Sequence, residues 1–267
     1  MSTDSVVTSC PDCDGRGWLV DLDAGAGTAH PCACQSKNRG SVLLERSGIP
    51  PRYMGTTLDS FKVDSPKYHD RLLEARTLSR KYVDTFVRPN GEFRKTGLLF
   101  VGPPGGGKTH LAVAVLRELI LRYSVVGRFV DFTSLVHQIQ STFDAGSQAS
   151  KQQVLDPIID AEVLVLDELG AQRSTAFVND TLYLVLNTRY TRCLPTLFTT
   201  NSPLEEATDE RLRGVSRLDA PSHQPTEVPL SARIPTRLVS RLFEMAQRVE
   251  LPVEDFRRVV GFSQALI

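Results

Sequence analysis

The chain has 267 residues, of which 41% are hydrophobic and 23% charged, as in a globular protein with one full core and a small additional module. Lysine plus arginine equals aspartate plus glutamate, 31 each, so no net charge draws the protein to nucleic acid or membrane. No apolar run approaches the roughly 20 residues of a membrane span, and the N-terminus lacks the pattern of a secretory signal, so we expect a cytoplasmic protein.

Cysteines are concentrated near the start of the chain. One pair has the spacing C-x2-C and the other, 18 residues later, C-x-C, and four thiolates in two such clusters can bind Zn²⁺ tetrahedrally. The four are Cys10, Cys13, Cys32 and Cys34. His30 is an alternative fourth ligand. We therefore predict a structural zinc module over residues 1–58. Cys193 is interpreted as a helix-end residue.

After residue 58 the pattern changes twice. Residues 66–88 have apolar side chains at helical spacing and predict an amphipathic helix within a linker over residues 59–96. From residue 97 to 267, short apolar runs alternate with helical patterns, which predicts an α/β fold with a parallel sheet covered by helices on both faces. The expected strands are 98–101, 127–132, 163–167 and 195–201, and the expected helices are 108–123, 135–143 and 178–192.

A glycine-rich loop, GPPGGGKTH, follows the first of these strands and opens the first helix. It fits G-x-x-x-x-G-K-[ST], whose glycines let backbone N–H groups surround phosphate oxygens at a helix N-terminus. The loop residues are Gly102, Pro103, Pro104, Gly105, Gly106, Gly107, Lys108, Thr109 and His110. Lys108 is expected to contact the β- and γ-phosphates of a nucleotide, and the Thr109 hydroxyl is expected to bind Mg²⁺.

Two acids end the apolar run VLVLD and begin the next turn. Asp167 is expected to hold Mg²⁺ at the edge of the sheet where the phosphate loop lies. Glu168 is expected to act as the base that activates water, which favours hydrolysis over a passive nucleotide platform. Asn201 ends the strand TLFTT and is interpreted either as a residue that orients this water or as a turn former.

Near the C-terminus, RIPTRLVSRLFE places Arg237 and Arg241 four residues apart, so a helix would present both from one face. Together with GPPGGGKTH, VLVLDELG and TLFTTN, this stretch resembles the AAA+ ATPases. Within these the chain is similar to the DnaC/DnaI helicase-loader group, with IstB transposition helpers as close relatives. The resemblance covers residue 97 to the C-terminus, and the cysteine-rich start is also similar to loaders that carry a zinc module.

The resemblance implies roles for several residues. Asn201 takes the position of the first sensor, and Arg241 that of an arginine finger that, with Arg237, reaches the nucleotide of a neighbouring subunit. Self-association, the replicative helicase and single-stranded DNA are the implied partners, and ATP with Mg²⁺ and structural Zn²⁺ the implied cofactors. The resemblance also implies that the zinc module docks the helicase. The second sensor has no clear match, with Arg257 and Arg258 as candidates.

The implied DNA contact falls on the helix expected at 135–143. Phe143 is placed to stack on a base, and His137 or Gln140 to meet the DNA backbone, whereas the apolar residues of this helix are expected in the core. Arg189 and Tyr190 resemble a helix end of the loaders, with DNA, a neighbour and the fold itself as open alternatives. Residues 204–232 contain several prolines and predict an exposed segment.

The sequence therefore predicts an ATP-dependent loader of the replicative helicase. An IstB-like transposition helper would share every residue named above. A nucleotide-gated adaptor without turnover is a third hypothesis, which Glu168 disfavours because a switch has no use for a hydrolytic base. A small-molecule kinase is also disfavoured, because Glu168 would promote transfer of the phosphoryl group to water.

Overall fold

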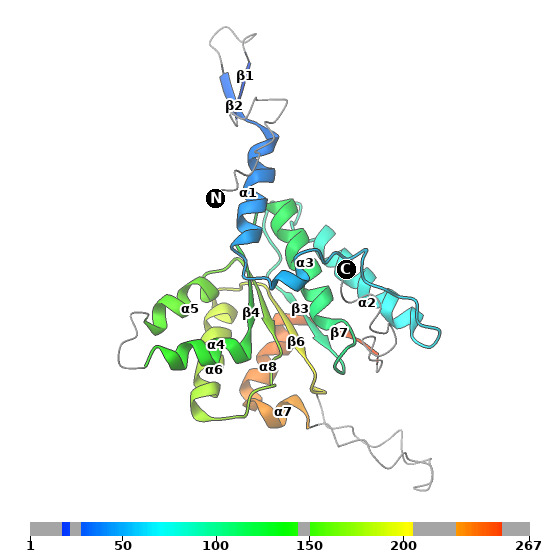
Figure 1. The fold of residues 1–267 in the computed structure, drawn as a ribbon, viewed down its shortest axis with the longest axis vertical. Coiled ribbons are helices and arrows are strands. Elements are labelled where there is room, and N and C mark those ends of the chain that lie inside the picture. Colours follow the sequence, from blue (N-terminus) through cyan, green and yellow to red (C-terminus); the bar gives the residue numbers. More distant parts are fainter. Residues whose placement is uncertain (1–17, 22–27, 144–149, 205–227, 253–267) are drawn as a thin grey trace, which may run out of the picture.

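A five-stranded parallel sheet forms the centre of the molecule (Figure 1). The computed structural model describes residues 18–21, 28–143, 150–204 and 228–252. The strand order is β4-β5-β6-β3-β7. The strands are β3 (Gly97–Val101), β4 (Gly127–Asp131), β5 (Val163–Asp167), β6 (Thr196–Thr200) and β7 (Ala246–Glu250). All neighbouring strands pair in parallel, so their carboxyl ends lie at one edge of the sheet.

Helices cover both faces of this sheet and divide the interior into two hydrophobic cores. One face packs against α2 (His69–Asp84) and α3 (Lys108–Tyr123). The other face packs against α4 (Phe132–Ser141), α5 (Lys151–Ile159), α6 (Ala176–Thr191), α7 (Leu230–Arg233) and α8 (Thr236–Met245). The predicted α/β fold with helices on both faces is confirmed.

Alternation along each strand assigns residues to the two cores. In β3, Leu98 and Phe100 belong to the core under α2 and α3, whereas Leu99 and Val101 belong to the opposite core. Successive side chains of a strand point to opposite faces, so a continuous apolar run is required when both faces are covered. The same rule explains the apolar run of β5, which is buried over its whole length.

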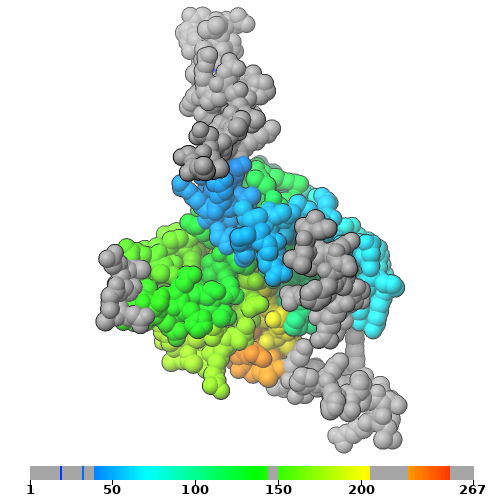
Figure 2. All heavy atoms as spheres, in the orientation of Figure 1, coloured from blue at the N-terminus to red at the C-terminus, as the bar shows by residue number. Residues whose placement is uncertain are grey.

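The N-terminal part begins with an antiparallel pair, β1 (Trp18–Asp21) and β2 (Thr28–Pro31), followed by α1 (Ala33–Glu45) and a short 3-10 turn, Pro51–Tyr53. The segment after α1 lies against the body of the molecule (Figure 2). Ile49, Leu58 and Phe61 join the same core as β3 and α3. Residues that the sequence placed in the zinc module and the linker thus contribute to the core of the ATPase-like part.

Several elements differ from the sequence-based expectation. The amphipathic helix expected over 66–88 is α2, which is shorter and ends at Asp84. The helices α1 and α5 and the edge strand β7 were not anticipated. In α5, Pro157 lies inside the helix, where proline ordinarily signals a break, and a capping box formed by Ser150 and Gln153 starts the helix. None of the helices in the described ranges is long and apolar enough to cross a membrane.

Arg189 is the largest fully buried side chain among the described residues, and it serves the fold. Its guanidinium donates hydrogen bonds of 2.7–3.2 Å to backbone carbonyl oxygens of Ile158, Ile159, Ala161 and Pro195 and to Thr196 Oγ1. Burial lowers the pKa of Arg189 to about 9, so the group is still protonated at neutral pH. The side chain ties the end of α6 to α5, β5 and β6. It is therefore not available for DNA, whereas Tyr190 is exposed.

We expect Arg189→Met to lower the free energy of unfolding by about 3 kcal/mol or more, because it retains most of the side-chain volume but leaves several buried carbonyl oxygens without a donor. The matched control is Arg192→Met, which removes an exposed arginine paired with Asp160 at 2.6 Å and should cost less than about 1 kcal/mol. Urea unfolding followed by circular dichroism measures both. Equal losses in the two variants would contradict the structural role of Arg189.

Candidate functional site

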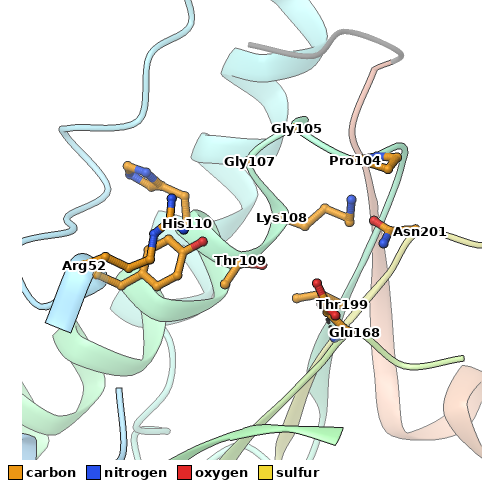
Figure 3. A pocket seen from close by; sticks show the side chains of 11 residues that line it. Arg52, Pro104, Gly105, Gly107, Lys108, Thr109, His110, Glu168, Thr199 and Asn201 are labelled. Atoms are coloured by element: carbon orange, nitrogen blue, oxygen red, sulfur yellow. Dashed lines mark hydrogen bonds between the residues drawn. The ribbon is translucent and has the colours of Figure 1, made fainter. Parts of the chain in front are cut away.

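The carboxyl ends of β3, β5 and β6 meet around a cavity of about 210 Å³ (Figure 3). The phosphate loop leaves β3, the two acids end β5, and Asn201 follows β6. Because β6 lies between β3 and β5, its last residues separate the loop from the acids. The topology therefore brings together segments that lie far apart in the sequence.

The loop between β3 and α3 is closed by Gly107, the N-cap of α3. Its φ of 87° lies in the left-handed region, and a Cβ there would lie 2.6 Å from Cε2 of Phe61. Lys108 is the first residue of α3, and its side chain is largely buried, with Nζ donating a 2.6 Å hydrogen bond to the Pro103 carbonyl oxygen. The loop thus closes on itself around the N-terminus of α3, where helix N–H groups favour anions.

Asp167 is buried at the end of β5 and is held by two hydroxyl groups. Thr199 Oγ1 donates to Asp167 Oδ1 at 2.6 Å, and Thr109 Oγ1 donates to the same oxygen at 3.0 Å. Burial raises the pKa of Asp167, and these two hydrogen bonds oppose the shift. Carboxylate and hydroxyl oxygens are the ligands that Mg²⁺ prefers, so Thr109 and Asp167 together fit a magnesium ion.

Glu168 begins a tight turn and exposes its side chain to the cavity. Its φ is +58°, which is uncommon for a residue other than glycine, and its backbone N–H donates to Thr199 Oγ1 at 2.9 Å. Thr199 therefore links the two acids, since one hydroxyl donates to Asp167 and accepts from Glu168. These contacts fix the backbone of Glu168, from which its exposed side chain enters the cavity.

Asn201 lines the same cavity, with its side chain beside Pro104 and on the same side as the Lys108 ammonium group (Figure 3). The arrangement brings the amide to the expected phosphate end. His110 also lines the cavity, but its Nε2 lies 3.1 Å from both Ser60 Oγ and the Thr57 carbonyl oxygen. Burial lowers the pKa of His110, which favours the neutral ring. The histidine thus joins the cavity to the segment before α2.

Sequence reasoning missed three residues of this site. Arg52 and Tyr53 line the cavity, with Arg52 on the side away from Glu168 and Asn201 (Figure 3), and Thr199 contacts both acids. Thr199 lies in the quoted strand TLFTT, but no local pattern separates it from Thr200. Arg52 and Tyr53 are about fifty residues from the phosphate loop in sequence, and only the packing of their segment on α3 brings them near.

Arg237 and Arg241 both lie on α8, as the spacing predicted, but neither lines this cavity. The Arg237 guanidinium lies 4.8 Å from the ring centroid of Tyr183 on α6. The Arg241 guanidinium lies between Tyr183 and Tyr190, and its Nη1 donates a 2.6 Å hydrogen bond to Asn187 Oδ1. The pair is therefore fixed on the surface of α6, outside the chain's own site.

Other predicted site residues lie where the structure gives no test. Cys10, Cys13, Arg257 and Arg258 are outside the described residues, and the side chains of His30 and Cys34 are not described either. Cys32 is buried at the N-cap of α1, and Cys193 is exposed just after α6. Within the described ranges, no three histidine, cysteine or acidic side chains gather as a metal site. The zinc module stays a prediction.

Known proteins are similar to this chain in sequence and in fold. The model of the family described as IstB-like ATP binding protein matches residues 68–214. The replicative helicase loader DnaC of Escherichia coli is 28% identical over 185 residues, which cover 68% of this chain and 71% of that protein. The crystal structure of the DnaC helicase loader is 27% identical with a TM-score of 0.58, covering 76% of this chain and 100% of the other. The crystal structure of DnaI, 23% identical with a TM-score of 0.54, covers 78% of this chain and 94% of the other and is similar in fold.

Burial of the Asp167 carboxylate lowers the free energy of unfolding, and this effect can be measured. Its pKa is raised in the folded chain, so ionisation above the ordinary aspartate pKa destabilises the fold, and the full cost is present once the pH exceeds the raised value. We therefore expect Asp167→Asn, without nucleotide or Mg²⁺, to unfold at a higher temperature than wild type at pH 8, with the difference shrinking towards pH 4. Asp160→Asn removes an exposed carboxylate and is the control. A lower Tm for Asp167→Asn at pH 8 would contradict this account.

Proposed function

The chain belongs to the IstB-like ATP-binding family, in the AAA+ group that includes the DnaC helicase loaders, and on this basis we propose that it is an ATPase that loads the replicative helicase onto single-stranded DNA. The observation that carries the proposal is the cluster of Lys108, Thr109, Asp167, Glu168 and Asn201 around one cavity. Nucleotide binding follows from the family, and the hydrolytic roles and the partners are our inference.

ATP would bind with its phosphates at the N-terminus of α3. The N–H groups of the loop from Gly102 to Gly107 would surround the phosphate oxygens, and Lys108 would exchange its bond to Pro103 for the β- and γ-phosphates. Thr109 and Asp167 would hold Mg²⁺, which when bound neutralises charge on these phosphates. Arg52 and Tyr53 line the cavity, with Arg52 on the side away from Glu168 (Figure 3), and would flank the nucleoside.

Hydrolysis would use the residues at the other end of the cavity. Glu168 would accept a proton from the attacking water, because its exposed side chain lines the cavity next to Asp167. The metal would be held by Asp167 and Thr109, which would leave the Glu168 carboxylate available as a base. The Asn201 amide would orient this water or contact the γ-phosphate. Thr199 would keep the two carboxylates in fixed relative positions through its hydrogen bonds to both residues.

The remaining charge stabilisation would come from a second copy of the chain. Arg237 and Arg241 lie on the α6–α8 surface, are cationic, and are held in place by aromatic rings and an amide. A pair fixed there can enter the cavity of an adjacent subunit, where Arg241 would stabilise the charge that develops on the transferred phosphoryl group. This arrangement makes turnover depend on assembly.

Contact with DNA is proposed for the end of α4. Leu135, Val136 and Ile139 are buried, as expected for an amphipathic helix. Phe143 keeps 65% of its surface exposed and lies edge-on to Phe177 at 6.0 Å between ring centroids. An exposed aromatic ring supported by a second ring is suited to stacking on a base, with His137 and Gln140 as the proposed backbone contacts.

Docking of the helicase is proposed for the N-terminal module. The antiparallel pair places Trp18 opposite Pro31, so the chain that precedes β1 and the chain that follows β2 leave from the same end of the hairpin. Cys10 and Cys13 precede β1 in sequence, and Cys32 and Cys34 follow β2. This topology supports the proposal that the four cysteines bind one zinc ion.

The decisive experiment measures ATP hydrolysis by the purified chain alone, with single-stranded DNA, and with the replicative helicase of the same organism. A helicase loader should be stimulated by both partners. Stimulation by DNA without any binding to the helicase would favour an IstB-like transposition helper instead. ATP-dependent binding of partners with no hydrolysis would favour the adaptor. The control is Glu168→Gln, which should bind ATP but hydrolyse it at least about a hundredfold more slowly, because it lacks the base.

Mixing of variants tests the proposed trans arrangement. Arg241→Ala should bind ATP with unchanged affinity and lose most turnover, whereas Lys108→Ala should fail to bind ATP but still present Arg241 to a neighbour. Adding an excess of Lys108→Ala to Arg241→Ala should therefore restore part of the ATPase rate. If Arg241→Ala hydrolyses ATP normally, or the mixture recovers nothing, the trans-acting arginine is wrong.

A further inference from the structure

The turn that carries Glu168 is held by contacts from two different segments. Two of its residues have left-handed backbone conformations, Glu168 with φ +58° and Gly170 with φ +83°. For glutamate this costs of order 1 kcal/mol, so the surrounding structure must enforce it. On one side β6 does so, since Leu169 N–H donates to the Thr199 carbonyl oxygen at 2.8 Å and Thr200 Oγ1 donates to the Leu169 carbonyl oxygen at 2.8 Å.

On the other side the turn is held by α7. Arg233 Nη1 donates a 3.1 Å hydrogen bond to the Gly170 carbonyl oxygen. Leu230 is fully buried against the same residue, and a Cβ on Gly170 would lie 2.7 Å from Leu230 Cδ1. The Leu230 N–H donates to the Pro203 carbonyl oxygen at 2.7 Å, which fixes α7 to the loop after β6. This short helix is thus anchored to both chain segments at the phosphate end of the site.

A second cavity, of about 220 Å³, lies next to the first. It is lined by Arg233 and Gly170 and shares Pro104 and Asn201 with the nucleotide cavity. Arg233 therefore borders the space just beyond the proposed γ-phosphate position. Its guanidinium is half-buried, and its Nη1 is directed to the Gly170 carbonyl oxygen in the turn that carries Glu168.

The connection between α7 and α8 is short and is held by backbone hydrogen bonds on both sides. Ile234 N–H donates to the Leu230 carbonyl oxygen at 3.0 Å, and Leu238 N–H donates to the Pro235 carbonyl oxygen at 2.8 Å. Ile234 and Leu238 are both buried in the same core. Arg233 therefore lies on the same packed segment as α8, four residues before Arg237.

We propose that Arg233 is a positioning residue that couples helix α8 to Glu168 of the same chain. When Arg237 and Arg241 engage the nucleotide of the neighbour, α7 shifts with α8 and Arg233 sets the turn that orients Glu168. Each subunit would then adjust its own hydrolysis according to whether its arginines are engaged next door. This inference rests on the proposed ATP hydrolysis and adds a residue that acts within its own subunit.

The test uses Arg233→Met, which keeps the apolar part of the side chain and removes the hydrogen bond to Gly170. We expect kcat for ATP to fall about tenfold, as for one lost hydrogen bond from a charged donor, with KM and ATP affinity unchanged. Arg233→Lys, which retains a cation and a donor, should recover most of the loss. Arg192→Met is the matched control and should hydrolyse ATP like the wild type. Unchanged kcat, or a parallel loss of ATP affinity, would overturn the proposal.

A mixing experiment separates this role from that of Arg241. An excess of Lys108→Ala supplies intact arginines to neighbours, so it should restore turnover to Arg241→Ala but not to Arg233→Met, whose defect lies within its own subunit. Restoration of Arg233→Met by the same partner would show that Arg233 acts across the interface and would overturn the inference. If the wild-type chain hydrolyses no ATP under any condition, the proposed function and this inference fail together. If the wild-type chain hydrolyses ATP and Arg233→Met hydrolyses it at the same rate, the inference fails and the proposed function stands.

Discussion

The site depends on one buried hydrogen-bond cluster that joins the end of β5 to β6 and to the first turn of α3. Asp167 is taken out of water by its position in a strand that is covered on both faces, and such a carboxylate is costly unless donors surround it. Thr199 and Thr109 supply these donors from segments that the sheet order brings alongside. The phosphate loop, the acids and Asn201 are thereby held at one edge by contacts between residues far apart in sequence.

This cluster leaves an electrostatic cost in place. Burial still raises the pKa of Asp167 despite its hydrogen bonds, so the fold is less stable with the carboxylate ionised than it would be with a neutral side chain. A divalent cation bound beside Thr109 would offset this cost, and under the proposed function that gain would contribute to the affinity for a metal-bound nucleotide. Lys108 is a second charged side chain that is largely buried, and its ammonium group donates a hydrogen bond to the carbonyl oxygen of Pro103 in the loop. The free-energy cost of burying these two charged side chains is offset by the stability of the rest of the core.

Sequence patterns predicted the strands β3 to β6, the phosphate loop and the two acids because these features are local: an apolar run, a glycine-rich spacing and a polar residue at a strand end. They missed α5, where Pro157 concealed a helix that starts from a capping box. They also left the role of Arg189 open, because a charged residue at a helix end gives no sign that four backbone carbonyls converge on it. Arg52, Tyr53 and Thr199 were missed because their relation to the site exists only in three dimensions.

The position of α8 places Arg237 and Arg241 on a different surface from the turn that carries Glu168. The helix packs with α6 on the face of the sheet opposite α3, and its arginines are engaged by Tyr183, Tyr190 and Asn187 of α6. They are therefore directed away from the chain's own cavity. The preceding α7, by contrast, contacts that cavity's turn through Arg233. The segment formed by α7 and α8 thus contacts the turn of Glu168 through Arg233 and carries Arg237 and Arg241 on its second helix. Under the proposed assembly it would bear on two nucleotide sites, its own through α7 and the neighbour's through α8.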